Sequence, residues 1–532
     1  MKEAANATPR YPDLFGHPRG LSLLFLTEMW ERFCYFGMRG LLVLYLTKSL
    51  LQGDDQSFAI YGAYTALVYM APVLGGRLAD SILGYRIAVI LGAVMMAIGE
   101  FLILGGSQTW LYVGMAAIIV GNGYFKANIS SLVGKLYTAD DPRRDSGFTI
   151  FYIGVNLGAL LATLVVVWVG ERFGFQYGFG LAGIGMLLGL LIFAAGQKYY
   201  KEEGRPPRPE KLHSKVLGPL TQLQLTVLLS FLAIPMLYLL IIYNGVMGIL
   251  LILTFLYVGY TLMREGIRGG RILRDRMIIF IILCLFNILF WALFEQAGSS
   301  LTLFADRNVD RNVFGIFEMT AGQTQFFNPF FIIVMGSLIS MLWVKLSEHN
   351  LNPNIPAKFG YGIMLLGIGY LITRFGLYTY NEAFLVPLWI IVAIYFFHTM
   401  GELFISPIGL SMVTKLAPEK LSGTLMGAWF LSFSGSNFLG GQLAKLTHSS
   451  EAAVETTISV ETVEAGTEFV AANAQTVAAN VETVVNASTP AALESLTRYI
   501  DVYTSFGLIA VATGLLVLIL SPKLNKLMHG IK

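Results

Sequence analysis

The stretch from Leu21 to Thr47 constrains the fold more than any other part of the chain. It is long enough to cross a bilayer, which takes about 20 apolar residues. Yet four ionisable side chains lie in its middle and second half, namely Glu28, Glu31, Arg32 and Arg39. An ionisable group at membrane depth costs at least ~2.5 kcal/mol, so four of them in one span need a cause.

The spacing of these residues supplies part of that cause. Glu28, Arg32 and Arg39 fall with Tyr35 on one face of a helix, because they follow one another by four, three and four positions. Glu31 lies beside this stripe. Such a face is unsuited to lipid, where charged and unpaired polar groups are costly. We therefore expect it to face the interior of a helical bundle or a water-filled cavity.

The composition extends this interpretation to the whole chain. Of 532 residues, 55% are hydrophobic and 13% are charged, whereas a soluble domain has about 25% charged residues. The sequence therefore predicts an all-α membrane protein with many spans. Fourteen apolar stretches are expected to cross the membrane, near 21–47, 57–80, 86–105, 109–137, 147–169, 177–197, 220–243, 246–263, 277–304, 324–346, 359–378, 386–415, 422–446 and 500–520.

Lysine and arginine residues follow every second span. The segment 198–215 alone carries six of them, and 264–276 carries five, while the alternate loops carry few. Because positively charged loops favour the cytoplasm, we expect both termini to be cytoplasmic. The first residues lack the basic, apolar and cleavage regions of a signal peptide, so the first span is expected to direct insertion.

The order of the spans predicts three parts. Residues 1–200 form one group of six spans, residues 201–276 a cytoplasmic linker with two inserted spans, and residues 277–532 a second group of six. Two six-helix halves around a central substrate are typical of alternating-access carriers. A long periplasmic loop is expected at about 449–499; its spaced Val and Ala residues leave open a helix, an ordered cap or a flexible loop.

Several motifs resemble known transporters. The sequence GGRLADSILGYR at 75–86 is similar to the loop motif of the major facilitator superfamily. The sequence EMWERFCY at 28–35 has the pattern Glu-x-x-Glu-Arg-Phe-x-Tyr. Together with GNGYFKANISSLVGKLY at 121–137, FYIGVNLGALLA at 151–162, FWALFEQAGSSL at 290–301, NPFF at 328–331, GELFISPIGLS at 401–411 and LMGAWF at 425–430, it resembles the bacterial proton-dependent oligopeptide transporters.

The resemblance covers nearly the whole chain except 449–499, and two departures are visible. Phe36 stands where the family usually has a second tyrosine, which removes a hydroxyl group. Ala127 stands where a proline usually follows Lys126. The resemblance implies two six-helix bundles with two extra helices between them, in a bacterial inner membrane, and proton-coupled import of di- and tripeptides.

A dipeptide is a zwitterion, so its carrier needs groups of both signs. Arg39 and Lys126 suit its carboxylate, and Glu402 suits its ammonium group, with Ser406 one helical turn further along. Amides bind a peptide bond because they donate and accept, and aromatic rings supply walls with a polar handle. The resemblance implies that the matching positions line the peptide site: Tyr35, Arg39, Tyr69, Lys126, Asn156, Asn328, Glu402 and Trp429.

Proton coupling requires a carboxylate whose protonation changes a conformational equilibrium. A carboxyl group that alternates between burial and an arginine partner can bind and release a proton. Glu28, Glu31 and Arg32 form such a set. Glu295 is the further candidate, and the resemblance implies that it pairs with Arg39 across the two halves.

Other interpretations remain for these residues. Glu28, Glu31 and Arg32 could be a structural ion cluster, and His398, one turn before Glu402, fits packing better than proton relay. A carrier of another small anion or zwitterion is the nearest alternative. A membrane enzyme lacks support, because no zinc motif, nucleophile elbow or phosphate-binding loop occurs. We expect lipid and small peptides as partners, no nucleic acid, no metal, no cofactor besides the coupling proton, and a functional monomer.

Overall fold

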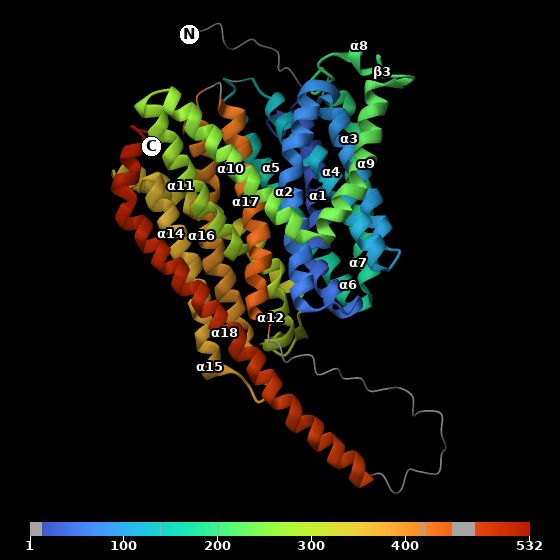
Figure 1. The fold of residues 1–532 in the computed structure, drawn as a ribbon, viewed down its shortest axis with the longest axis vertical. Helices are drawn as coiled ribbons and strands as arrows, with labels where there is room; N and C mark the ends of the chain where they lie inside the picture. The colour runs from blue at the N-terminus through green and yellow to red at the C-terminus, as the bar shows by residue number, and fades with distance from the viewer. Residues whose placement is uncertain are drawn as a thin grey trace.

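The structure is a computed structural model that describes residues 13–138, 140–200, 202–416, 418, 421–448 and 474–531. Long helices run side by side along one direction, with α8 and β3 at one end of the molecule and α12 and α15 at the other (Figure 1). We call these the α8 end and the α12 end.

Helices account for nearly all of the regular structure. They are α1 (Arg19–Leu44), α2 (Asp54–Leu78), α3 (Gly84–Ile103), α4 (Gln108–Lys135), α5 (Arg144–Leu161), α6 (Val167–Phe173), α7 (Phe175–Ala195), α8 (Pro209–Leu212), α9 (Gln222–Ile242), α10 (Asn244–Arg268), α11 (Arg271–Phe294), α12 (Ser300–Asn308), α13 (Phe327–Glu348), α14 (Ile355–Leu371), α15 (Gly376–Thr379), α16 (Leu388–Leu416), α17 (Ser422–Ala444) and α18 (Ala474–Leu527). Short helical turns of other types join several of them: a π-helical turn at Ala162–Val166 and 3-10 helical turns at Glu295–Gly298 and Ile372–Phe375.

The strands are short and lie outside the long helices. They are β1 (Asp13–Leu14), β2 (His17–Pro18), β3 (Lys215–Leu217), β4 (Leu220–Thr221), β5 (Val309–Asp310), β6 (Asn312–Val313), β7 (Phe317–Glu318) and β8 (Val386–Pro387). β1–β2, β3–β4 and β6–β7 are antiparallel pairs, and β5 pairs with β8 in parallel, Val309 opposite Val386. They hold loops together at the two ends of the bundle, and among the described residues they form only two-stranded sheets.

Each apolar stretch expected from the sequence coincides with a helix or with helices joined by one of these turns. Ten segments among the described residues are long and apolar enough to cross a membrane, and one of them, Asp54–Ile103, spans both α2 and α3. The chain is therefore a mainly helical, multi-pass membrane protein.

Helix α18 bears on the alternatives left open for 449–499, and it favours a helix over the second half of that segment. It is 54 residues long and begins at Ala474, so the second half of that segment continues without a turn into the last apolar stretch. Alanine and glutamate are good helix formers, which favours this continuation. The helix projects beyond the α12 end in Figure 1. Residues 449–473 lie outside the described part of the chain.

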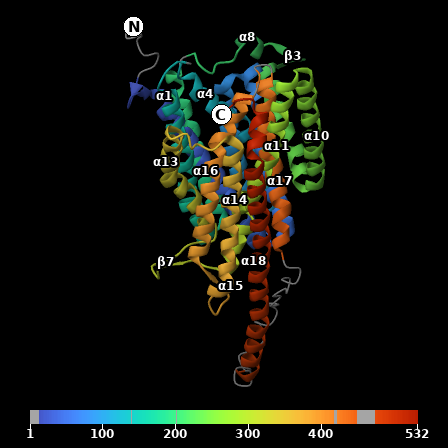
Figure 2. The same ribbon diagram turned by 90° about the vertical axis from the view of Figure 1, so that its left-hand side faces the viewer.

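Two groups of helices pack together. In the N-terminal half (residues 13–199), α1 contacts α5 and α7, while α4 contacts α2 and α3. In the C-terminal half (residues 277–531), α14 lies between α16 and α18, and α11 contacts α17. The pairs α2–α17 and α5–α13 join the halves. Helix α9 packs on α4 and α10 on α11, so the inserted helices contact different halves. Figure 2 shows α10 at the right-hand edge, on the side of α11 and α17.

Glycine pairs allow the closest helix contacts. A Cβ atom on Gly92 of α3 would lie 2.6 Å from the carbonyl oxygen of Gly121 on α4, and one on Gly121 would lie 2.6 Å from that of Gly92. Gly360 of α14 and Gly514 of α18 approach in the same way. Small residues at such contacts are typical of helices packed in a bilayer.

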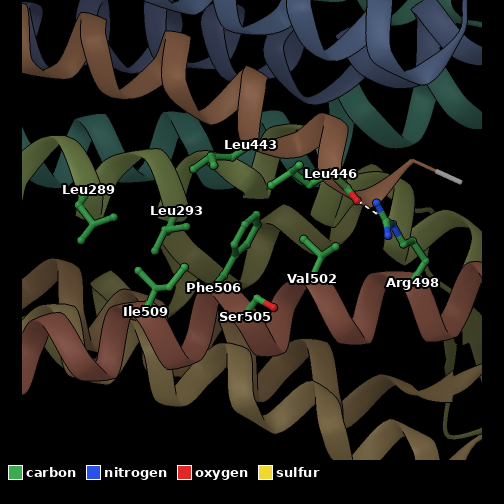
Figure 3. A pocket seen from close by; sticks show the side chains of 9 residues that line it. All are labelled: Leu289, Leu293, Leu443, Leu446, Arg498, Val502, Ser505, Phe506 and Ile509. Atoms are coloured by element: carbon green, nitrogen blue, oxygen red, sulfur yellow. Dashed lines mark hydrogen bonds between the residues drawn. The ribbon is translucent and has the colours of Figure 1, made fainter.

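The outward faces of the helices are apolar. Leu232 of α9, Leu256 of α10 and Ile519 of α18 are 60%, 66% and 74% exposed. Exposed apolar surface on this scale marks a lipid-facing side. An apolar crevice of about 270 Å³ also lies between α11, α17 and α18, with Arg498 at one end (Figure 3). None of the candidate site residues lines this crevice. Its lining consists of Leu289, Leu293, Leu443, Leu446, Arg498, Val502, Ser505, Phe506 and Ile509.

Candidate functional site

The charged residues of α1 form a compact cluster inside the N-terminal half. Arg32 Nε lies 2.7 Å from Glu28 Oε1 and 3.0 Å from Glu31 Oε2, and all three side chains are buried. Asn122 of α4 donates a hydrogen bond of 3.2 Å to the other oxygen of Glu31. One guanidinium group is therefore shared between two buried carboxylates.

Helix α5 closes over this cluster. A Cβ atom on Gly158 would lie 2.2 Å from the carbonyl oxygen of Met29 and 2.8 Å from Cβ of Arg32. Only glycine permits this approach of α5 to α1, since any larger side chain would overlap the backbone of α1. The tight contact fixes the helix that carries Asn156 against the helix that carries the charges.

Lys126 lies close to aromatic rings from two helices. Its Nζ is 3.9 Å from the ring centre of Tyr69 on α2 and 5.9 Å from that of Tyr35 on α1. Ammonium groups within about 6 Å of a ring face are attracted to it. Tyr69 in turn stacks on Phe433 of α17, with ring centres 5.7 Å apart. The lysine of one half thus lies beside a contact between the halves.

Arg39 joins the two halves. Its Nη2 forms a short ion pair with Glu295 Oε2, as the sequence resemblance implies, and its Nε donates to the Tyr61 hydroxyl at 2.7 Å. Arg39 and Glu295 are both buried. Burying an ion pair is favourable only where further hydrogen bonds satisfy it, which is the contribution of Tyr61.

Glu402 has a different environment in the C-terminal half. Asn328 Nδ2 of α13 donates to Glu402 Oε2 at 2.8 Å and to Thr399 Oγ1 at 3.0 Å. No lysine or arginine within the described residues forms an ion pair with Glu402. Its electrostatic neighbours are Arg39 and Glu295, which face one another. The carboxyl group is half-buried and held by neutral donors.

The remaining candidates are less closely tied to this centre. Asn156 Nδ2 donates to the carbonyl oxygen of Tyr152 on its own helix at 3.0 Å. Trp429 is buried, with its ring edge-on to Phe433 at 6.0 Å. Ser406 is half-buried on α16, and no hydrogen bond joins it to Glu402 in the described part of the chain.

His398 lies against Tyr370 with ring centres 4.5 Å apart, and it is buried. This environment fits the expected packing role. Within the described residues, no group of three or more His, Cys, Asp and Glu side chains is arranged to hold a metal ion.

Three polar partners were missed from the sequence, namely Tyr61, Asn122 and Thr399. Asn122 precedes Lys126 by four positions and Thr399 precedes Glu402 by three, so each shares a helical face with a charged residue. That spacing was available as a signal. Tyr61 offers no such signal, because its partner lies on another helix.

Polar links between the halves also gather at the α12 end. Lys48 Nζ lies 2.5 Å from Asp306 Oδ1. Arg307 donates to both oxygens of Asp54, at 2.5 and 2.8 Å. No ion pair joins the two halves at the α8 end among the described residues.

Comparison with known proteins identifies the family. A sequence profile of the POT family matches residues 82–460, more than half of the chain. The chain belongs to the POT family. The family resemblance seen in the motifs is therefore confirmed.

Individual relatives agree with this assignment. The chain is 36% identical over 446 residues to the uncharacterized transporter YclF of Bacillus subtilis, covering 81% of this chain and 88% of that protein. It is 35% identical over 449 residues to dipeptide and tripeptide permease A of Salmonella typhimurium, covering 84% and 88%. A solved structure of peptide transporter POT in complex with sulfate is 32% identical, with a TM-score of 0.79, covering 98% of this chain and 97% of that chain.

Proposed function

We propose that this POT family member imports di- and tripeptides together with protons by alternating access. The observation that carries the proposal is the arrangement of charges from the two halves around one centre. Lys126 from the N-terminal half and Glu402 from the C-terminal half both lie within electrostatic range of Glu295. A zwitterionic peptide offers each of them a partner of opposite sign.

The recognition roles follow from the partners that each group already has. Glu402 accepts hydrogen bonds from neutral groups, so a peptide ammonium would be its first full counter-charge. Lys126 contacts rings and Arg39 is paired with Glu295, so the peptide carboxylate would compete with Glu295 for Arg39. Tyr69, Asn328 and Glu402 are half-buried, which leaves them within reach of a small solute.

Charge balance gives the proton its role. The set comprises four carboxyl groups, on Glu28, Glu31, Glu295 and Glu402, and three cations, on Arg32, Arg39 and Lys126. A zwitterion adds no net charge, so one bound proton makes the loaded site neutral. Neutrality matters because an uncompensated charge is costly in a low-dielectric interior.

The cycle would exchange the ion pairs at the α12 end for contacts at the α8 end. The distribution of lysine and arginine favours cytoplasmic termini in a bacterial inner membrane, and this makes the α12 end periplasmic. Residues 1–200 and 277–532 would be the moving halves, with 201–276 as linker and inserted helices. No enzymatic step, metal or cofactor is part of this proposal, and one chain carries the whole site.

Uptake of labelled dialanine into liposomes containing the purified chain tests the proposal. We expect accumulation above the external concentration under an inward proton gradient, and its loss when the gradient is collapsed. Accumulation of nitrate or another small anion without dialanine would favour the alternative solute. Absence of any dialanine movement in a folded sample would refute the proposal.

A further inference from the structure

Glu100 is a buried carboxyl group that the proposed mechanism does not use. It lies on α3, one helical turn before the α12 end of that helix, in the apolar run GAVMMAIGEFLI. Its side chain is 0% exposed. In contrast to the acids of α1, it forms no ion pair with any lysine or arginine in the described part of the chain.

The contacts of Glu100 are few and weak. Its Oε1 accepts a hydrogen bond from Cys34 Sγ on α1 at 3.3 Å, and a thiol is a weak donor. Its Oε2 is buried without a hydrogen-bond partner among the described residues. Helix α7 closes the other side, since a Cβ atom on Gly183 would lie 3.2 Å from Cβ of Glu100.

A carboxylate in this position would be poorly compensated. Moving an isolated charge into an apolar interior costs far more than one thiol hydrogen bond returns. A carboxylic acid costs much less, because it is neutral and still accepts from Cys34. In this conformation Glu100 therefore holds a proton.

Polar groups extend from Glu100 toward the coupling cluster. Cys34 is three residues from Glu31 on α1 and lies about 4.5 Å further toward the α12 end. Cys34 and Tyr64 of α2 are both within electrostatic range of Glu31 and Glu100. The Tyr64 hydroxyl and Asn122 Oδ1 are buried without hydrogen-bond partners in the described structure, and such atoms commonly bind internal water.

No positive charge competes for this acid within the described residues. From α1 it faces Cys34, from α2 Tyr64, and from α7 Gly183. Helix α4, which also packs on α3, brings no charged group to it in the described structure. Arg32 of the cluster is held by two carboxylates. Proton occupancy at Glu100 therefore depends on access from the α12 end and on exchange with Glu31.

We propose that Glu100 is a second proton-binding site of the transport cycle, ahead of Glu31 on the periplasmic side. In each cycle the proton leaves the Glu100 oxygen for the Glu31 carboxylate, and the Glu100 carboxylate takes a proton from the periplasm. Cys34 keeps its own proton and serves as a hydrogen-bond donor. The proposal rests on the proposed function, because it assumes a proton-driven cycle.

The test counts protons per peptide in liposomes containing the full chain. Dialanine uptake and internal acidification are measured together for the natural protein, Glu100→Gln and the exposed control Glu348→Gln. We expect Glu100→Gln to lose the proton that Glu100 passes to Glu31, so that dialanine still exchanges but its uptake no longer acidifies the interior. Glutamine preserves the shape but binds no proton. The control should keep the natural ratio.

Infrared spectroscopy supplies a second readout. The natural protein should show a protonated carboxyl band that Glu100→Gln lacks. If Glu100→Gln does not fold, Glu100→Asp and Cys34→Ser take its place, and both should shift that band while keeping the natural proton ratio.

The outcomes separate the two proposals. An unchanged ratio in Glu100→Gln, or an unshifted band in both substitute variants, overturns the role of Glu100 while leaving symport intact. If the natural protein moves dialanine with no protons at all, the proposed symport itself fails.

Discussion

The two halves hold their carboxyl groups in contrasting ways. In the N-terminal half, Glu28 and Glu31 share one arginine at 2.7 and 3.0 Å, and all three are buried. In the C-terminal half, Glu402 is held at 2.8 Å by the neutral amide of Asn328 and remains half-buried. One half neutralises its acids internally, whereas the other leaves an acid without a counter-charge.

This difference assigns different work to the halves. An acid that shares a cation can take up a proton when the cation moves to its neighbour, so the cluster on α1 suits coupling. An acid supported by neutral donors suits recognition of an incoming ammonium group. Arg39 and Glu295 link the two, because their ion pair spans both halves and lies near Glu402.

The largest expected effect is the loss of coupling between proton movement and dialanine uptake, and we expect it from Glu31→Gln. The variant removes one of the two acids that share Arg32, so a proton can no longer be traded within the cluster. We expect proton-driven accumulation of dialanine to fall to the level seen without a gradient, because no proton then moves with the peptide. Uptake into liposomes under an imposed proton gradient measures this.

The same liposomes supply the control for Glu31→Gln. Exchange of external for internal dialanine needs no net proton movement, and we expect it to persist in part. Driven accumulation at the natural level would remove Glu31 from the coupling set and weaken the contrast between the halves.

Sequence spacing predicted what lies within one helix. Glu28 and Arg32 are four positions apart, and a helix brings such residues together whatever surrounds it. The pair between Arg39 and Glu295 joins positions 256 apart, and only the family resemblance indicated it. Spacing carries no information about which helices touch, because packing depends on many apolar contacts at once.

Neutral partners were the hardest to foresee. Tyr61 is an ordinary residue for a membrane helix, and nothing in its local sequence marks it as the partner of a charged group. Glu100 shows the opposite case, since a single carboxyl group in an apolar run stands out in the sequence itself. The absence of a lysine or arginine beside Glu100 cannot be read from the sequence, because it depends on which helices pack around Glu100.

Glu402→Gln tests the recognition half of the comparison. Glutamine keeps the shape and the contact with Asn328 but cannot pair with an ammonium group. We expect dialanine affinity to fall roughly 10- to 100-fold, because a hydrogen bond to a charged group contributes about 1.5–3 kcal/mol. Competition assays with dialanine and N-acetyl-dialanine measure the loss; if both peptides weaken equally, Glu402 does not bind the ammonium group.

Arg39→Ala tests the ion pair that links the two halves. Removing the guanidinium group deprives the peptide carboxylate of one partner, and we expect roughly tenfold weaker binding of free peptides relative to amidated ones. It also leaves Glu295 buried without its cation, so the protein should unfold at a lower temperature. Glu295→Gln is the matched variant. It should also lower stability, but it removes the competitor for Arg39 and should therefore strengthen free peptides relative to amidated ones. Equal losses for both peptide forms in Arg39→Ala would argue against a contact with the carboxylate.

Phe36→Tyr should have the smallest effect, because it adds one hydroxyl group and removes nothing. The ring of Phe36 lies edge-on to Tyr35, with centres 5.3 Å apart, and the Arg39 guanidinium carbon is 5.6 Å from its centre. A hydroxyl group here adds a polar contact of about 1 kcal/mol, or roughly fivefold in relative affinity. Competition with peptides that differ only in a polar or apolar side chain measures the change.

The double variant Tyr35→Phe with Phe36→Tyr keeps the composition and moves the hydroxyl by one position, so it should reverse the preference if the hydroxyl group contacts the peptide. An unchanged order of peptides in both variants would place Phe36 outside the recognition surface and confine selectivity to the charged groups of the two halves.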